Sequence, residues 1–230
     1  MKKTYARLFQ HIMQAMKMNQ QHLALPYDPA NPPKVDVNGK PLPKNHFSRV
    51  ARHEAGHLLL NWLLDNRPCG AMLLANGEAC STSEHPDDSL MAIGLAKVAG
   101  FVAAGEKRHL RSIRANWDRP QTFAIDNDCH WVTAAAQHAL DDLAPNLGWL
   151  FIEALIRTVE EACLTYGREL AALAAILKRN GYIKYPETET IFKAMDEKYK
   201  VRCPDWVLDR CLDHVQAVYK EHQEQQAGES

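Results

Sequence analysis

Residues 53–57 read His-Glu-Ala-Gly-His, and this HExxH pentapeptide has the residue types and spacing of a metal site. On a helix, His53 and His57 are one turn apart and point the same way, so their rings can take two corners of a tetrahedral zinc site. The carboxylate of Glu54 would then lie beside the position of a bound water. Zinc lowers the pKa of such a water to about 7, and the carboxylate can accept its proton. The pattern indicates metal-assisted hydrolysis; the plainer alternative is two helical histidines packed near a surface glutamate.

A catalytic zinc site normally has three protein ligands and leaves one position to water. The metzincin pattern HExxHxxGxxH fails, because Leu60 and Leu63 stand where its Gly and third His would be. Glu106, at the end of an Ala-rich segment, stays open as a third ligand on chemistry alone. Asp128 is the better candidate, since it follows a loop at the predicted first turn of a helix. The alternative role of Asp128 is that of an acidic residue favoured by the helix dipole.

The helix that carries the two histidines is predicted from Ser48, a capping residue, to about Leu64. On it the histidines share one face with Leu60 and Leu64, which places them at the edge of a core. Gly56 lies in the middle of this helix, where glycine costs about 1 kcal/mol relative to alanine. We therefore expect a close backbone approach at Gly56, for which a second helix packed beside the metal is one candidate.

The remaining pattern predicts a mainly α fold with one small β-hairpin. Together with the HExxH helix, it is expected to be a helical zincin-like metallopeptidase domain. The segment 26–43 holds six prolines and is expected to be an irregular connector with a turn at Asn38-Gly39. The segment 106–125 is charged and is also expected to be irregular. The hairpin is predicted over 70–83 with its turn at Asn76-Gly77, and further helices over 4–23, 88–105, 127–143, 147–179, 187–198 and 204–222.

Composition narrows the function classes. Among 230 residues, 46% are hydrophobic and 24% charged, and the net charge is −1, so the charge balance gives no case for nucleic acid as a partner. No apolar run approaches the roughly 18 residues of a membrane span, and the N-terminus has no continuous apolar region typical of a secretory signal. We therefore expect a cytoplasmic protein without a membrane span. The six scattered cysteines are expected to be reduced thiols.

The segment around Asp128 also carries a family resemblance. Together with the HEAGH helix, it resembles the peptidase domain of the FtsH-type AAA+ metalloproteases, which have a later segment of the form (S/N)-N-D-x-x-x-A-T. Asn127, Asp128 and Thr133 match that form, and Val132 replaces its alanine. Residues 99–106 loosely resemble the family's GGRxAEE helix, and 165–192 its C-terminal helical pattern. The resemblance implies that Asp128 is the third zinc ligand.

The likeness covers roughly residues 46–195, and this sequence holds neither the Walker A motif nor the transmembrane segments of that family. The resemblance and the helix pattern together predict three parts, namely an N-terminal helix and connector (1–45), an FtsH-like zinc peptidase domain (46–200), and a C-terminal helix with a frayed tail (201–230).

By the same resemblance, the substrate is a peptide or an unfolded protein, and a homo-oligomer or a separate partner protein stays open. His130 is a further candidate for binding substrate, with plain packing as its alternative. The competing function is a catalytically silent metal-binding module for regulation or interaction.

Overall fold

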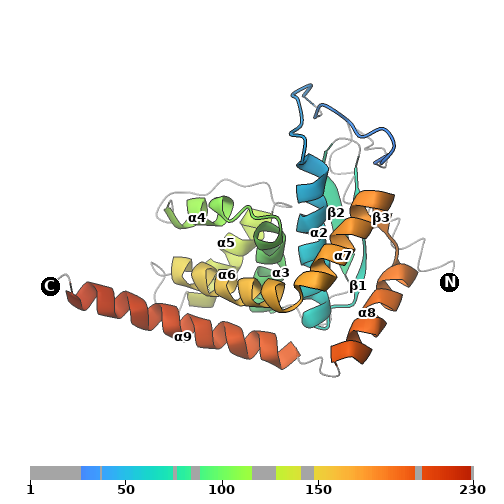
Figure 1. Cartoon of the computed structure of the whole chain (residues 1–230). Helices are drawn as coiled ribbons and strands as arrows, with labels where there is room; N and C mark the ends of the chain where they lie inside the picture. The colour runs from blue at the N-terminus through green and yellow to red at the C-terminus, as the bar shows by residue number, and fades with distance from the viewer. Residues whose placement is uncertain are drawn as a thin grey trace.

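The structure, a computed structural model, describes residues 27–36, 38–74, 77–83, 89–115, 128–140, 148–199 and 204–228. Within these ranges lie eight helices and one small antiparallel sheet, which confirms the predicted mainly α fold with a hairpin (Figure 1). The elements are, in chain order, α2 (His46–Leu63), β1 (Pro68–Leu73), β2 (Ala79–Ser83), α3 (Leu90–Ala103), α4 (Arg108–Ala115), α5 (Asp128–Leu140), α6 (Gly148–Thr165), α7 (Gly167–Asn180), β3 (Tyr182–Ile183), α8 (Tyr185–Tyr199) and α9 (Pro204–Gly228).

Helix α2 is the centre of the fold. It contacts α3 and α7 as well as the strands β1 and β2, and every residue from Glu54 to Leu63 is buried. A helix buried all round must be enclosed by neighbours on several sides, which is more than the single apolar face expected from the sequence. The helix begins at His46 after Asn45, so Ser48 lies inside its first turn and is not its cap.

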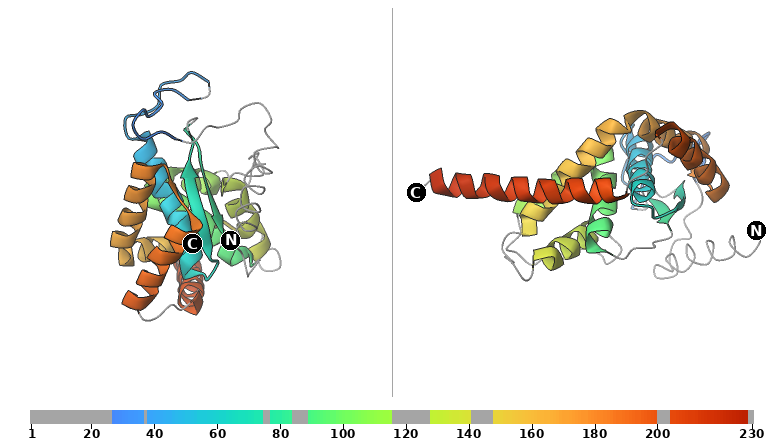
Figure 2. Two further views of the ribbon diagram at one scale, coloured as in Figure 1. Left: turned by 90° about the vertical axis from the view of Figure 1, so that its right-hand side faces the viewer. Right: turned by 90° about the horizontal axis from the view of Figure 1, so that it is seen from below.

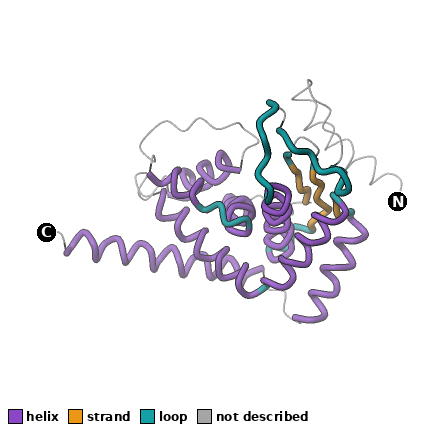
Figure 3. Tube along the Cα trace, turned by 45° about the horizontal axis from the view of Figure 1, so that its top comes forward, coloured by secondary structure: helices purple, strands orange, loops and turns teal. Residues whose placement is uncertain are grey.

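The sheet has the strand order β2-β1-β3, with all neighbours antiparallel, and its strands lie together on one side of the molecule (Figure 3). The predicted hairpin is confirmed as β1 and β2. Its turn is closed by hydrogen bonds from Gly77 N to Leu74 O and from Leu74 N to Glu78 O. The short third strand was not predicted from the sequence. It pairs Ile183 with Ala71, more than 100 residues earlier in the chain.

Helices α3, α5 and α6 pack against one another beside α2 (Figures 1 and 2). Ser89 caps α3, because its hydroxyl accepts a hydrogen bond from Ala92 N at 3.2 Å. The segment 106–125 is not wholly irregular, since it contains α4. That helix buries Leu110 and Ile113, which lie three residues apart on one face.

The long helix predicted over 147–179 is two helices. They are separated at Tyr166, whose φ of −106° and ψ of 28° leave the helical region. The Tyr166 ring packs edge-on against Trp62 at 5.6 Å and against Tyr199 at 5.0 Å. These contacts come from distant parts of the chain, so the local apolar pattern could not reveal the break. The predicted end at Asn180-Gly181 is confirmed, with Gly181 in the left-handed conformation.

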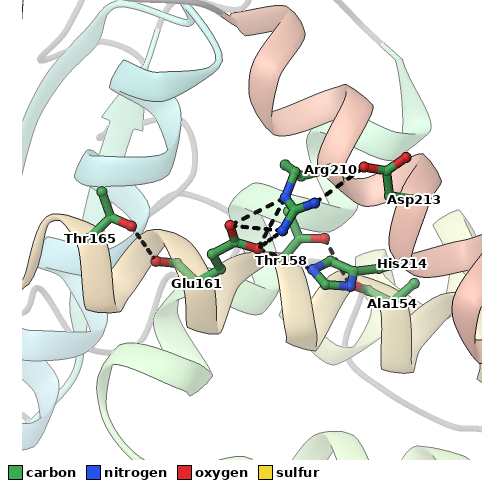
Figure 4. A network of polar contacts seen from close by, with 7 residues as sticks. All are labelled: Ala154, Thr158, Glu161, Thr165, Arg210, Asp213 and His214. Atoms are coloured by element: carbon green, nitrogen blue, oxygen red, sulfur yellow. Dashed lines mark hydrogen bonds and ion pairs between the residues drawn. The ribbon is translucent and has the colours of Figure 1, made fainter.

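Helix α9 runs along α6, and its far end projects past the other helices (Figures 1 and 2). Val207 and Cys211 are fully buried in this contact. Beside them, the Arg210 guanidinium donates to the Glu161 carboxylate at 3.1–3.2 Å, and His214 lies 3.3 Å from the same carboxylate (Figure 4). The helix continues to Gly228, beyond the predicted end at 222.

The predicted helix over 4–23 lies outside the described residues. In the Pro-rich connector the predicted turn is present, with an isolated bridge between Val35 and Pro41 and a positive φ at Gly39. Among the described residues, no helix has both the length and the apolar character that crossing a membrane requires. The division into three parts stays a prediction.

Candidate metal centre

The two histidines of the HExxH segment lie on one side of α2, as their spacing predicts. Their rings are 4.7 Å apart and nearly perpendicular, at 81°. The His57 side chain is almost fully buried and that of His53 largely so. The histidines are therefore part of the interior, where neighbouring groups can hold their rings in one orientation.

Asp128 meets both rings from the first turn of α5. Its Oδ2 lies 2.9 Å from His53 Nε2 and 3.0 Å from His57 Nε2. The three residues thus offer ligand atoms within 4.8 Å of one another, and the cluster could hold a metal ion. Two ligand atoms of a tetrahedral zinc, each about 2.0–2.1 Å from the ion, are roughly 3.3 Å apart. The two separations between Asp128 and the histidines differ from this by a few tenths of an ångström, so Asp128 can share an ion with either ring.

The orientation of His57 is fixed by its second ring nitrogen. Nδ1 lies 2.7 Å from the carbonyl oxygen of Ala96 on α3, and because a carbonyl can only accept, Nδ1 carries the hydrogen and donates. In the neutral ring, Nε2 is then an acceptor, and it faces an acceptor oxygen of Asp128. Two acceptors 3.0 Å apart need a proton or a bound cation between them. The tautomer is the one that metal-binding histidines commonly have.

The His53 ring faces Glu106 in an ion pair, at a longer distance than a hydrogen bond. Its Nδ1 lies 3.8 Å from Glu106 Oε2, and Glu106 Oε1 lies 3.5 Å from Arg49 Nε. Glu106 therefore stands behind the ring, on the side away from Asp128, and is not a member of the ligand cluster. This carboxylate–histidine arrangement is typical of groups that orient a metal ligand.

Charges in the cluster are strongly coupled. Burial alone would lower the pKa of His53, but its interactions with Asp128 and Glu106 outweigh burial and raise the pKa to about 9. Burial alone would raise the pKa of Asp128, but the neighbouring His57 and His53 and the ammonium of Lys97 hold it well below its usual range. Asp128 is thus an anion at neutral pH, and its place in the first helical turn stabilises that charge further.

Glu54, the neighbour of His53 on α2, has a different environment. It is 6% exposed, and among the described residues its Oε2 has no hydrogen-bond partner. Burial, and after it the charge of Glu54, raise the pKa of the Cys80 thiol on β2 to about 11, which indicates that Glu54 lies close to this strand. A buried carboxylate oxygen without a partner is costly, and a water or a substrate group would satisfy it.

Two glycines let α3 come close to the histidines. A Cβ at Gly56 would lie 2.4 Å from the Ala99 carbonyl oxygen, which confirms the predicted close approach of a second helix. A Cβ at Gly100 would lie 2.5–2.7 Å from three atoms of the His53 ring. The ring of His53 therefore occupies the space that the Cβ of any other residue at position 100 would fill.

Three groups that shape the site were not predicted from the sequence, namely the Ala96 carbonyl, Gly100 and Lys97. Lys97 Nζ lies 3.0 Å from Asp128 Oδ1. A signal for this residue was present, because Lys97 is the single charged residue within Leu90–Ala103. Backbone carbonyls have no such signal.

Three further histidines, among them the candidate His130, are not members of this cluster. His130 is half-buried on α5 with its ring 5.7 Å from that of Trp131. His109 packs near Phe101, and His214 pairs with Glu161.

The chain was compared with family models and with curated proteins, and neither comparison gives a match.

Proposed function

We propose that the chain is a zinc-dependent metallopeptidase in which His53, His57 and Asp128 hold the ion and Glu54 is the general base. The observation that carries the proposal is the meeting of Asp128 Oδ2 with the Nε2 atoms of both HExxH histidines. The carboxylate comes from another helix, 71 residues after His57, so the sequence motif alone does not account for the meeting. The resemblance to FtsH-type peptidase domains belongs to the same proposal.

Zinc, when bound, supplies a Lewis acid that polarises a carbonyl and makes water nucleophilic near neutral pH. The residues of the chain do the rest. The buried Glu54 accepts the proton of the attacking water and passes it to the leaving amine. Ala96 O and Glu106 orient the rings of His57 and His53, respectively. Asp128 is ionised, so its carboxylate is able to bind a cation.

The sheet supports a peptide as substrate. Strand β2 is an edge strand of the described sheet and lies against α2 near Glu54. An extended peptide can add to such an edge through backbone hydrogen bonds. We propose that flexible or unfolded polypeptides are bound in this way. A cytoplasmic location, and a homo-oligomer or a separate partner protein, stay predictions.

Two histidines and one carboxylate also suit non-haem Fe(II). Glu54 is the reason to prefer hydrolysis with zinc, because an acid–base carboxylate beside the ligands serves proton transfer to and from water.

The test compares the wild type with Glu54→Gln and with Glu189→Gln, a control on the exposed surface of α8. Metal content is measured by elemental analysis and cleavage with casein. We expect about one zinc per chain in all three proteins and cleavage by the wild type and the control only. Zinc in every protein without cleavage by any would favour the silent metal-binding module. A wild type that binds no divalent ion rules out both functions.

A further inference from the structure

Lys97 is a charged residue with an unusual position. It is the single charged side chain of α3, a helix that otherwise consists of apolar residues and glycine. Its ammonium group lies 3.0 Å from Asp128 Oδ1, and its side chain is 35% exposed. The neighbouring carboxylate of Glu106 is engaged separately by Arg49 and His53. Lys97 is thus directed at the candidate third ligand.

The two oxygens of Asp128 have different partners. Oδ2 faces both histidine Nε2 atoms, whereas Oδ1 faces Lys97 Nζ. A carboxylate can bind a cation through one oxygen or through both. If both bound, the second oxygen would take a position that a catalytic site must leave to water or substrate. An ammonium group on Oδ1 competes with that second bond.

We propose that Lys97 is a positioning residue that keeps Asp128 a one-oxygen ligand and so leaves a coordination position open for substrate. This inference rests on the metal site of the proposed function. It goes beyond naming the ligands, because it assigns the number of oxygens that Asp128 contributes and the group that limits it.

The role in positioning is separable from a role in folding. Partly exposed ion pairs contribute about 0–1 kcal/mol to stability, so the loss of the Lys97 charge leaves the protein folded. Groups that orient a metal ligand have a larger effect on the site itself, and their removal typically reduces affinity or activity about 10–100-fold.

The test uses Lys97→Met, which removes the charge but keeps an unbranched side chain, and Lys97→Arg, which keeps a cation that donates to the carboxylate. Lys198→Met is the matched control, since Lys198 also pairs with a carboxylate, that of Glu169, on the α8 side of the fold. X-ray absorption of the zinc-loaded proteins gives the number of first-shell ligands. The visible spectrum of the cobalt-loaded proteins reports the coordination number independently.

For the wild type, Lys97→Arg and Lys198→Met we expect about four first-shell ligands and the intense cobalt bands of four-coordination. For Lys97→Met we expect one additional oxygen, weaker cobalt bands, and kcat/KM on a peptide reduced about 10–100-fold. A Lys97→Met protein with the wild-type ligand number and spectrum overturns the inference. If the wild type binds zinc but cleaves nothing, the proposed function fails while the coordination comparison still decides the role of Lys97. If it binds no zinc, both fall together.

Discussion

At the scale of residues, each candidate ligand has a second partner that fixes its direction. His57 donates to Ala96 O, His53 faces Glu106, and Asp128 faces Lys97. Such partners hold the ligand atoms together before an ion arrives, so less ordering is needed on binding. The distinction between ligand and partner can be measured, because the loss of a ligand removes a bond to the ion and the loss of a partner only loosens one.

Substitutions of Glu106 and Asp128 allow that comparison, since both residues were candidates for the third ligand. We expect Asp128→Ala to abolish tight zinc binding and Glu106→Ala to weaken it about 10–100-fold, because Glu106 acts through the His53 ring. Competition with a chromogenic chelator gives both affinities, with the exposed Glu189→Ala as control. The reverse order of effects would show that Glu106 is the direct ligand.

Gly100→Ala tests the space around His53. The new Cβ would lie 2.5–2.7 Å from the ring, so the ring must leave its position beside Asp128. We expect zinc affinity to fall at least about 10-fold. The free energy of unfolding should fall by about 0–2 kcal/mol, since overpacking costs about 1–3 kcal/mol and the helix propensity of alanine returns up to about 1 kcal/mol. Gly167→Ala is the control, because its Cβ would meet nothing within 4 Å. Unchanged zinc affinity in Gly100→Ala would contradict this account.

The sequence predicted the side chains that form the cluster but not the groups that orient them. The HExxH spacing places two rings on one helical face, and the resemblance pointed to Asp128. The role of Ala96 could not be found, because any residue has a carbonyl and its use depends on where α3 crosses α2. Glu106 was recognised as chemically suitable, yet its place behind His53 depends on the packing of the same two helices.

At the scale of elements, the contact between α2 and α3 determines the position of the site. Gly56 allows the contact, since a Cβ there would lie 2.4 Å from the backbone oxygen of Ala99 and 2.8 Å from the Cβ of Ala103. Backbone atoms cannot rotate away as the end of a side chain can, so α3 would have to shift as a whole. The site and the fold therefore depend on the same glycine.

We expect Gly56→Ala to destabilise the protein even though alanine is the better helix former. Overpacking costs about 1–3 kcal/mol or more, and the gain in helix propensity is about 1 kcal/mol. For a chain of this length, each kcal/mol corresponds to about 2–4 °C in Tm. A thermal unfolding curve should show Tm lowered by several degrees in the metal-free protein. An unchanged or higher Tm would mean that α3 moves away at no cost.

Elements were predictable where local signals decide and not where distant contacts decide. The positive φ at Gly77 in the hairpin turn and the helix end at Gly181 follow from local backbone preference. The separation of α6 from α7 depends on the rings of Trp62 and Tyr199 around Tyr166, and strand β3 exists only because β1 is there to pair with it.

At the scale of the whole molecule, the candidate site joins two segments that are far apart in the sequence. The histidines belong to α2, and Asp128 belongs to α5, 75 residues after His53. An ion held by all three would link these helices directly. Because the unfolded chain has no such arrangement, binding free energy adds to folding free energy.

Zinc should therefore raise the thermal stability of the wild type in proportion to its affinity. At a free zinc concentration 100 times Kd, the added stability is about 2.7 kcal/mol, which corresponds to a rise in Tm of roughly 5–11 °C. Excess chelator should reverse the rise. Asp128→Ala is the control, since it keeps both histidines and all six cysteines, so any zinc bound elsewhere on the chain appears equally in this variant. An equal rise in wild type and variant would place the zinc outside the cluster, whereas a rise confined to the wild type would show that α2 and α5 hold the ion jointly.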